Sequence, residues 1–289
     1  MEDLGDNLKL SIFKRGYKRG AFDTEVDGPL HWAIQEEFIE AALYLIQEAG
    51  EDTNRLDSNQ RSPLDWALEK DYLDVFKALL KNGANVNFRD TTSSILHKVV
   101  RQNKYKYVEI LINKGANIHC LSQSHHTPLH FATLYCYGAT DIAEILIKNG
   151  ADVNSVTNDL QSPLLFASAE GYQEMVKLLL ENGANPNKKD FQDNEPIHYA
   201  SGRGQNQIVE ILIQHGVDLN TRGQHSFTPL QFAIYASQSG TAQIFLKYGT
   251  SFISNDPGHF FPIERAMANK NLDIFKLLVF FEPLTKRQK

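Results

Sequence analysis

The stretch "TPLHFA" at residues 127–132 is the clearest copy of a phrase that recurs along this chain of 289 residues. The other copies are "GPLHWA" (28–33), "SPLDWA" (62–67), "SILHKV" (94–99), "SPLLFA" (162–167), "EPIHYA" (195–200), "TPLQFA" (228–233) and "FPIERA" (261–266). Successive copies start 32 to 35 residues apart. A period of this length indicates a stack of repeats that share one elongated core.

Each repeat carries the signals of two helices and a loop. Pro at the second position of the phrase suits the first turn of a helix, because its missing N–H would have no partner there. A preceding Ser or Thr, such as Thr127, is a good N-cap. A second apolar segment, such as "EMVKLLLENG" (174–183), ends at a Gly that takes a left-handed conformation without strain. The phrase "NGANVN" (82–87) and its near-copies therefore mark where a helix pair ends and a loop begins.

The period and the phrase resemble the ankyrin repeat family, whose signature is T-P-L-H-x-A. The resemblance implies an all-α solenoid of stacked helix-turn-helix units with short β-hairpin fingers. It also implies that partner proteins bind the concave groove and the finger tips. We place a capping helix (6–15) and a first finger within residues 1–27, and a tail at 283–289. Residues 28–282 hold eight repeats, approximately 28–61, 62–93, 94–126, 127–161, 162–194, 195–227, 228–260 and 261–282.

Composition narrows the function classes. The net charge of -6 argues against a surface that binds nucleic acid mainly through phosphates. Two cysteines, Cys120 and Cys136, are too few for a disulfide framework, and no apolar run approaches the length of a membrane span. We therefore expect an intracellular, cytoplasmic protein without a transmembrane segment. A bacterial effector secreted without a cleavable signal is the alternative.

Catalytic motifs are missing from the sequence. It contains no phosphate-binding G-x-x-x-x-G-K-S/T, no H-E-x-x-H and no G-x-S-x-G. We expect a non-enzymatic scaffold or adaptor that binds a partner protein, with no cofactor, no small-molecule substrate and no nucleic acid. The alternatives are a substrate-targeting module of a larger or multi-subunit enzyme, or a nucleic-acid-binding solenoid.

One group of side chains raises the question of a metal. It comprises His119, Cys120, His125, His126, His130 and Cys136. Zinc or copper uses such ligands, but the spacing of a tetrahedral site is missing. The resemblance implies that the histidine of the repeated phrase, here His130, forms local hydrogen bonds. We therefore expect no metal.

An aromatic residue follows this histidine position in six repeats, as Trp32, Trp66, Phe131, Phe166, Tyr199 and Phe232. Such a ladder could stack bases or a proline-rich peptide. Packing between repeats is the expectation that we prefer, because large aromatic side chains usually serve cores.

The candidate binding surface lies in repeats four to seven. Finger positions where the family places a Gly here hold Gln60, His125, Leu160, Asp193, Ser226 and His259. The fourth repeat also has two extra residues, in "ATLYCYGATD", and insertions often map to a binding face. Aromatic and Arg side chains are enriched at binding hot spots. The predicted partner-binding residues are His125, His126, Leu134, Tyr135, Tyr137, Phe191, Arg203, Arg222, His225, Phe227, Tyr235 and Phe260.

Two further departures carry predictions. The third repeat has Ile95 in place of Pro, Lys98 in place of an aromatic residue and Val99 in place of Ala, so we expect it to be the weakest unit. The last helix carries the apolar run "LLVFF" (277–281), which predicts self-association or an adjoining segment that covers it. The alternative is that Phe280 and Phe281 fold back onto the last repeat. Pro283 is expected to end this helix.

Overall fold

The computed structural model describes Ser11 and residues 28–250 and 262–285, with side chains described as far as Phe280. Ser11 is helical, but the rest of the predicted capping helix and the first finger lie outside the described residues. Phe260 and His259 lie outside them as well. The described residues divide into two compact units, residues 1–123 and residues 124–289, which are treated separately below.

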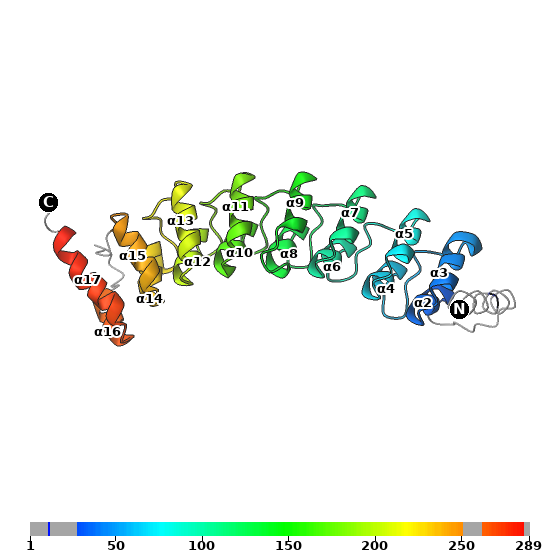
Figure 1. Ribbon diagram of the computed structural model, residues 1–289, viewed down its shortest axis with the longest axis horizontal. Helices are drawn as coiled ribbons and strands as arrows, with labels where there is room; N and C mark the ends of the chain where they lie inside the picture. Colours follow the sequence, from blue (N-terminus) through cyan, green and yellow to red (C-terminus); the bar gives the residue numbers. More distant parts are fainter. Residues whose placement is uncertain (1–10, 12–27, 251–261, 286–289) are drawn as a thin grey trace, which may run out of the picture. The chain divides into compact units, whose positions relative to one another are not determined.

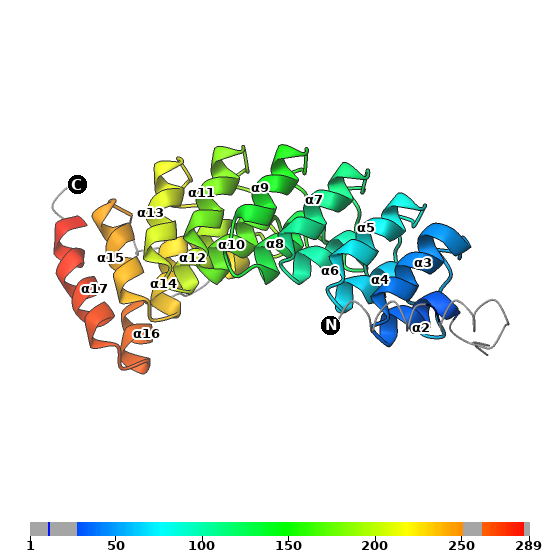
Figure 2. The ribbon, with the colours of Figure 1, turned by 45° about the vertical axis from the view of Figure 1, so that its right-hand side comes forward.

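Within its described residues, unit 1 contains three helix pairs. Its helices are α2 (Pro29–Gln35), α3 (Ile39–Tyr44) with its π-helical continuation η1 (Leu45–Ala49), α4 (Pro63–Glu69), α5 (Leu73–Lys81), α6 (Ile95–Arg101) and α7 (Tyr105–Asn113). The first helices of the pairs, α2, α4 and α6, lie in one row, and the second helices lie in another (Figures 1 and 2). This is the helix-turn-helix stack that the repeated phrase predicts.

Unit 2 continues the pattern with five pairs. The first helices are α8 (Pro128–Tyr135), α10 (Pro163–Glu170), α12 (Pro196–Gly202), α14 (Pro229–Tyr235) and α16 (Pro262–Ala268). The second helices are α9 (Asp141–Lys148), α11 (Gln173–Glu181), α13 (Asn206–Gln214), α15 (Ser239–Lys247) and α17 (Leu272–Thr285), and a short 3-10 turn, η2 (Gln224–Ser226), precedes α14. Each first helix packs on the next first helix, as α10 does on α12 (Figure 1).

The first helices begin as the phrase predicts. The Ser62, Ser94, Thr127, Ser162 and Thr228 side chains each accept a hydrogen bond from an amide of the first helical turn. The Leu or Ile after the phrase's second position is fully buried in each repeat from Leu64 to Leu230, and so is the phrase's Ala or Val. A single helix pair could not enclose these side chains, so the repeats must stack to bury them.

The loops between repeats differ from the expected β-hairpins. Within the described residues there is no strand, and only one isolated antiparallel bridge, between Arg89 and Ser94. An aspartate holds several of these loops instead. The Asp57 carboxylate accepts bonds from the Asn59 and Arg61 amides, and Asp190 accepts them from the Gln192 and Asn194 amides. Because a side chain satisfies these amides, the loop needs no extended ladder.

Two repeats contain extra residues, and each insertion has a local structural explanation. The end of the last helix also differs from the prediction. The extra residue of the first repeat lies where a π-helical turn, Leu45–Ala49, widens the second helix. The extra residues of the fourth repeat form a turn in which Tyr137 and Gly138 both have positive φ, 50° and 82°. The prediction that Pro283 ends the last helix was wrong, because α17 continues to Thr285. The helix thus includes Pro283 within its final turn.

A candidate partner-binding face

The loop tips of unit 2 hold side chains in backbone conformations that normally favour glycine. His125, Leu160, Asp193 and Ser226 occupy the tip positions and have φ between 58° and 62°. These are the positions at which the sequence departs from the family's Gly. A non-glycine residue in this region is strained by about 1 kcal/mol or more. The tips therefore retain side chains at an energetic penalty, as strained residues at functional sites do.

The first of two aromatic clusters surrounds the insertion of the fourth repeat. Tyr135 ends α8 and packs on Phe131, with 5.1 Å between the ring centroids, while 41% of Tyr135 stays exposed. Tyr137 follows in the turn and is 85% exposed. A side chain at Gly138 would come within 3.0 Å of the Tyr172 ring, so this turn lies close against the next repeat. Leu134 is half-buried.

The two histidines of the fourth repeat's loop behave differently. His125 is exposed, whereas His126 is half-buried and stacks on Phe166 with 5.8 Å between centroids. Only His125 is therefore freely accessible to solvent. Burial is the main cause that lowers the pKa of His126, so the ring is neutral at physiological pH. A neutral imidazole on an aromatic ring extends the apolar part of this cluster.

The second cluster lies between the sixth and eighth repeats. Phe227 contacts His225, Phe232 and Tyr235, with centroid distances of 6.0, 6.0 and 5.9 Å. The guanidinium of Arg265 lies 4.0 Å from the centroid of the Tyr235 ring. Tyr235 is still 50% exposed, so it can contact a further molecule. Its cation–π contact holds the ring in place.

Three further predicted partner-binding residues, Arg203, Phe191 and Arg222, lie outside the two aromatic clusters and form hydrogen bonds of their own. Arg203 donates to Glu170 at 2.8 Å and to the Ala169 carbonyl at 3.2 Å. Phe191 is fixed through its backbone, because its amide donates to Asp159 of the neighbouring loop at 3.1 Å, and its side chain is 62% exposed. Arg222 donates to the Ser226 carbonyl of its own loop at 2.9 Å.

We call the surface formed by these loop tips and first helices of unit 2 the aromatic face. Among the described residues, its exposed large apolar side chains include Tyr135, Tyr137, Leu160, Phe191 and Tyr235. The sequence prediction omitted Arg265 and Leu160. Arg265 occupies the ladder position of its repeat, where a basic residue in place of an aromatic one was the available signal.

The ladder itself is half-buried and forms structural hydrogen bonds. Trp66 donates from Nε1 to Asp57 at 2.8 Å, and Tyr199 donates to Asp190 at 2.6 Å. Burial, followed by the bond to Asp190, raises the pKa of Tyr199 to about 12. These contacts favour the packing interpretation of the ladder.

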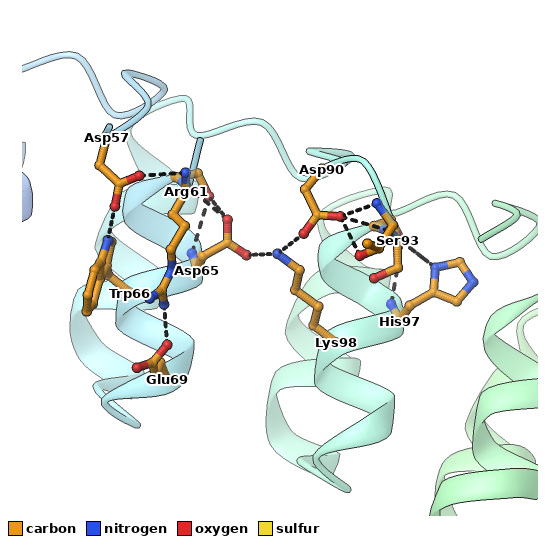
Figure 3. Close-up of polar contacts among 12 residues, drawn as sticks. Asp57, Arg61, Asp65, Trp66, Glu69, Asp90, Ser93, His97 and Lys98 are labelled. Atoms are coloured by element: carbon orange, nitrogen blue, oxygen red, sulfur yellow. Dashed lines mark hydrogen bonds and ion pairs between the residues drawn. The ribbon is translucent and has the colours of Figure 1, made fainter. Parts of the chain in front are cut away.

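The corresponding surface of unit 1 is charged and internally paired (Figure 3). Arg61 lies 3.7 Å from the centroid of the Trp66 ring and forms an ion pair with Glu69. Lys98 replaces the ladder aromatic and contacts two carboxylates, Asp65 at 2.5 Å and Asp90 at 2.8 Å. Although burial alone would raise it, the bonds from Lys98, Ser93 and Thr92 hold the pKa of Asp90 well below its usual range.

Of the histidines and cysteines considered above as metal ligands, His130 and Cys120 form contacts with neighbouring polar groups. Within unit 2, the Nδ1 atom of His130 accepts from the Thr127 amide at 3.1 Å, and Nε2 lies 3.1 Å from the Gln161 carbonyl. Within unit 1, the Cys120 sulfur lies 3.1 Å from Oγ of Ser94. Among the described residues, no three His, Cys, Asp or Glu side chains are arranged to hold a metal ion.

Stacked helix pairs joined by loops, with exposed aromatic side chains on the loop side of unit 2, define a helical repeat protein. The family model for ankyrin repeats matches residues 5–90, 96–190, 164–256 and 197–286, and the chain belongs to this family. Ankyrin repeats are generally protein–protein interaction modules. A search of curated proteins gave no match. None of the helices in the described ranges has the length and apolar character that a bilayer crossing requires.

Proposed function

We propose that this protein is a non-enzymatic scaffold or adaptor that binds a partner protein through the aromatic face of unit 2. One observation carries the proposal. The loop tips and first helices of unit 2 expose Tyr135, Tyr137, Phe191 and Tyr235, whereas the unit 1 equivalents of Tyr135 and Tyr235 are all polar or charged, and two of them, Glu69 and Lys70, form ion pairs. Exposed aromatic side chains are the usual anchors of a protein interface.

The way these anchors are held supports the proposal. Tyr135 and Tyr235 rest on neighbouring rings, and Phe191 is fixed by its backbone bond to Asp159. A side chain that is already ordered loses less conformational entropy on binding. The strained loop tips add a further argument, because a Gly at Leu160 would relieve the strain and would remove an exposed apolar side chain.

The test compares three forms of the chain in a quantitative pull-down followed by calorimetry with the captured protein. Replacing Tyr135 and Tyr137 together by Ala should weaken binding by at least ~2 kcal/mol, the usual threshold of a hot spot. The double variant should melt close to the parent, because Tyr137 is 85% exposed and Tyr135 is 41% exposed.

Tyr248→Ala is the matched control. Tyr248 belongs to the same unit and is 50% exposed, but it follows a second helix and lies outside the aromatic face. Its replacement should leave binding unchanged. A double variant that captures the same protein as tightly as the parent would remove the aromatic face as the binding surface.

A further inference from the structure

A shallow hollow of about 390 Å³ lies between α15 and α17, the second helices of the last two repeats. It is separate from the aromatic face, which is built from loops and first helices. Its lining consists of Ser239, Gly240, Gln243, Asp273, Lys276, Leu277 and Phe280. Apolar, small and oppositely charged side chains therefore share one surface.

Phe280 is the unusual residue of this surface. Its equivalents in the preceding repeats lie two residues before the helix-ending Gly. They are Lys81, Asn113, Lys148, Glu181, Gln214 and Lys247, all polar and all exposed. Stacking of repeats therefore does not require an apolar side chain at this position, even where another repeat follows. Phe280 is nevertheless 72% exposed, which points to a contact outside the repeat stack.

Gly240 leaves the hollow open beside the backbone of α15. Its equivalents in the second to sixth repeats, nine residues before the helix-ending Gly, are Asp74, Lys106, Asp141, Glu174 and Gln207, whose side chains are all exposed. At Gly240 the backbone itself is exposed and lines the hollow, because no side chain projects outward from it. The Asn206 side chain lies on one side of it, with Nδ2 2.8 Å from the place of an added Cβ. The knob at Phe280 and the hollow beside Gly240 thus occur on the same patch.

The charges at the hollow are also complementary to each other. Asp273 and Lys276 both belong to α17 and both line the hollow. A two-fold axis brings the same patch of two copies together, so it can place each residue opposite a different residue of the other copy. In such a pair Asp273 can face Lys276 of the second copy. Phe280 can then enter the hollow of the second copy beside Gly240.

We propose that this patch is a two-fold self-association site and that its occupant is a second copy of this chain. The patch supplies a projecting Phe280 ring, the hollow beside Gly240, and both a negative and a positive side chain. A following ankyrin repeat would not explain it, because the six equivalents of Phe280 are polar. The side chain of Phe281, which the sequence also suggested, lies outside the described residues.

Sedimentation equilibrium over a wide range of concentration tests the proposal on the full chain. The parent should show a monomer–dimer equilibrium. Phe280→Lys installs the residue found at the equivalent position in α5, and should raise the dimer dissociation constant at least about tenfold, as loss of a hot-spot contact does. Met267→Lys is the control, because Met267 is 62% exposed on α16 but does not line the hollow.

Two charge variants test the two-fold arrangement itself. Asp273→Lys alone and Lys276→Asp alone should each weaken the dimer, because each brings like charges together. An equal mixture of the two variants should associate again, since every facing pair is then opposite in charge. Circular dichroism confirms that each variant is folded.

Three results would overturn the proposal. The first is that the unmodified chain stays monomeric at every concentration, which would mean that the patch does not bind a second copy of this chain. The second is a dimer that Phe280→Lys and Met267→Lys weaken equally. The third is a pair of charge variants that fails to recover association on mixing.

Discussion

Glu195 stands where five other repeats place a Ser or Thr as the N-cap of the first helix. Its side chain is buried, and Oε1 accepts a hydrogen bond from the Thr221 hydroxyl at 2.6 Å. Burial is the largest effect on its pKa and raises it, and Asp218 adds to the rise, while Thr221 and Lys189 oppose it. A buried carboxylate therefore replaces a hydroxyl cap, which carries no charge.

Glu195→Thr should stabilise the protein by about 1 kcal/mol at neutral pH, the usual contribution of a Ser or Thr cap. Because the folded-state pKa of Glu195 is raised, its favourable contribution is complete below the unfolded-state value, about 4.3. It is lost as the pH rises through the folded-state value. The gain from the substitution should therefore be smaller in acid. Denaturant unfolding of both proteins across this pH range measures the difference.

Glu181→Thr is the control for that experiment, because Glu181 is exposed at the end of α11. Its effect should stay within about 0.5 kcal/mol and should not depend on pH. A stability gain for Glu195→Thr that is equal at all pH values would contradict the role given to the buried charge.

The sequence alone could predict which loop tips of the candidate site carry a side chain, but it could not predict which of the side chains are buried. Loop tips without Gly were visible in the sequence, and their positive φ values follow from the repeat register. Burial was not visible, because it depends on residues one period away. His126 is half-buried through Phe166, and Tyr235 is held by Arg265, which replaces the ladder aromatic of its repeat.

Among the elements, the third repeat shows why its phrase lacks Pro. The Ile95 amide donates to the Phe88 carbonyl at 3.0 Å, beside the bridge between Arg89 and Ser94. This repeat's loop is one residue shorter than its neighbours, and the bond closes it. A Pro at this position would have no N–H to donate.

Ile95→Pro should therefore destabilise the protein, although it restores the pattern of the other repeats. We expect a loss of about 2 kcal/mol, from the missing hydrogen bond and from reduced burial of an apolar side chain. Ile95→Val keeps the amide and should lose only about 1 kcal/mol. Thermal and denaturant melts distinguish them. Stabilisation by Ile95→Pro, as at compatible sites elsewhere, would show that the bond contributes nothing.

Helix positions were predictable because each phrase combines a cap, a Pro and an apolar period. The loops were less predictable, since the family resemblance suggested hairpins and the aspartate-centred turns replaced them. The length of α17 was also missed, because a Pro signal does not distinguish the interior of a helix from its final turn.

For the whole molecule, the division into compact units falls between Gln123 and Ser124, at the end of the third repeat. Long repeat arrays can lose cooperativity, so parts of them open separately. We predict that amides of α2 to α7 exchange with deuterium before those of α10 to α13. The reason is that the third repeat lacks the ladder aromatic and the small Ala of its neighbours.

Native-state hydrogen exchange read by mass spectrometry makes this comparison within one sample. The buried amides of α11 and α13 serve as the internal reference. Equal protection along the whole array would show that the ion pairs of Lys98 compensate fully for the departures of the third repeat.

The contact between Lys98 and Asp65 also has a consequence for the order of the repeats. Asp65 replaces the phrase's histidine in the second repeat, Lys98 replaces the aromatic residue in the third, and the two positions lie one period apart. Asp65 therefore has Lys98 as its cation only where the third repeat directly follows the second. Loss or exchange of the third repeat by recombination would leave the buried Asp65 carboxylate without its cation, and loss or exchange of the second would leave Lys98 without Asp65. These two modules are therefore not interchangeable with the others, and an engineer who shuffles this array should move them as a pair.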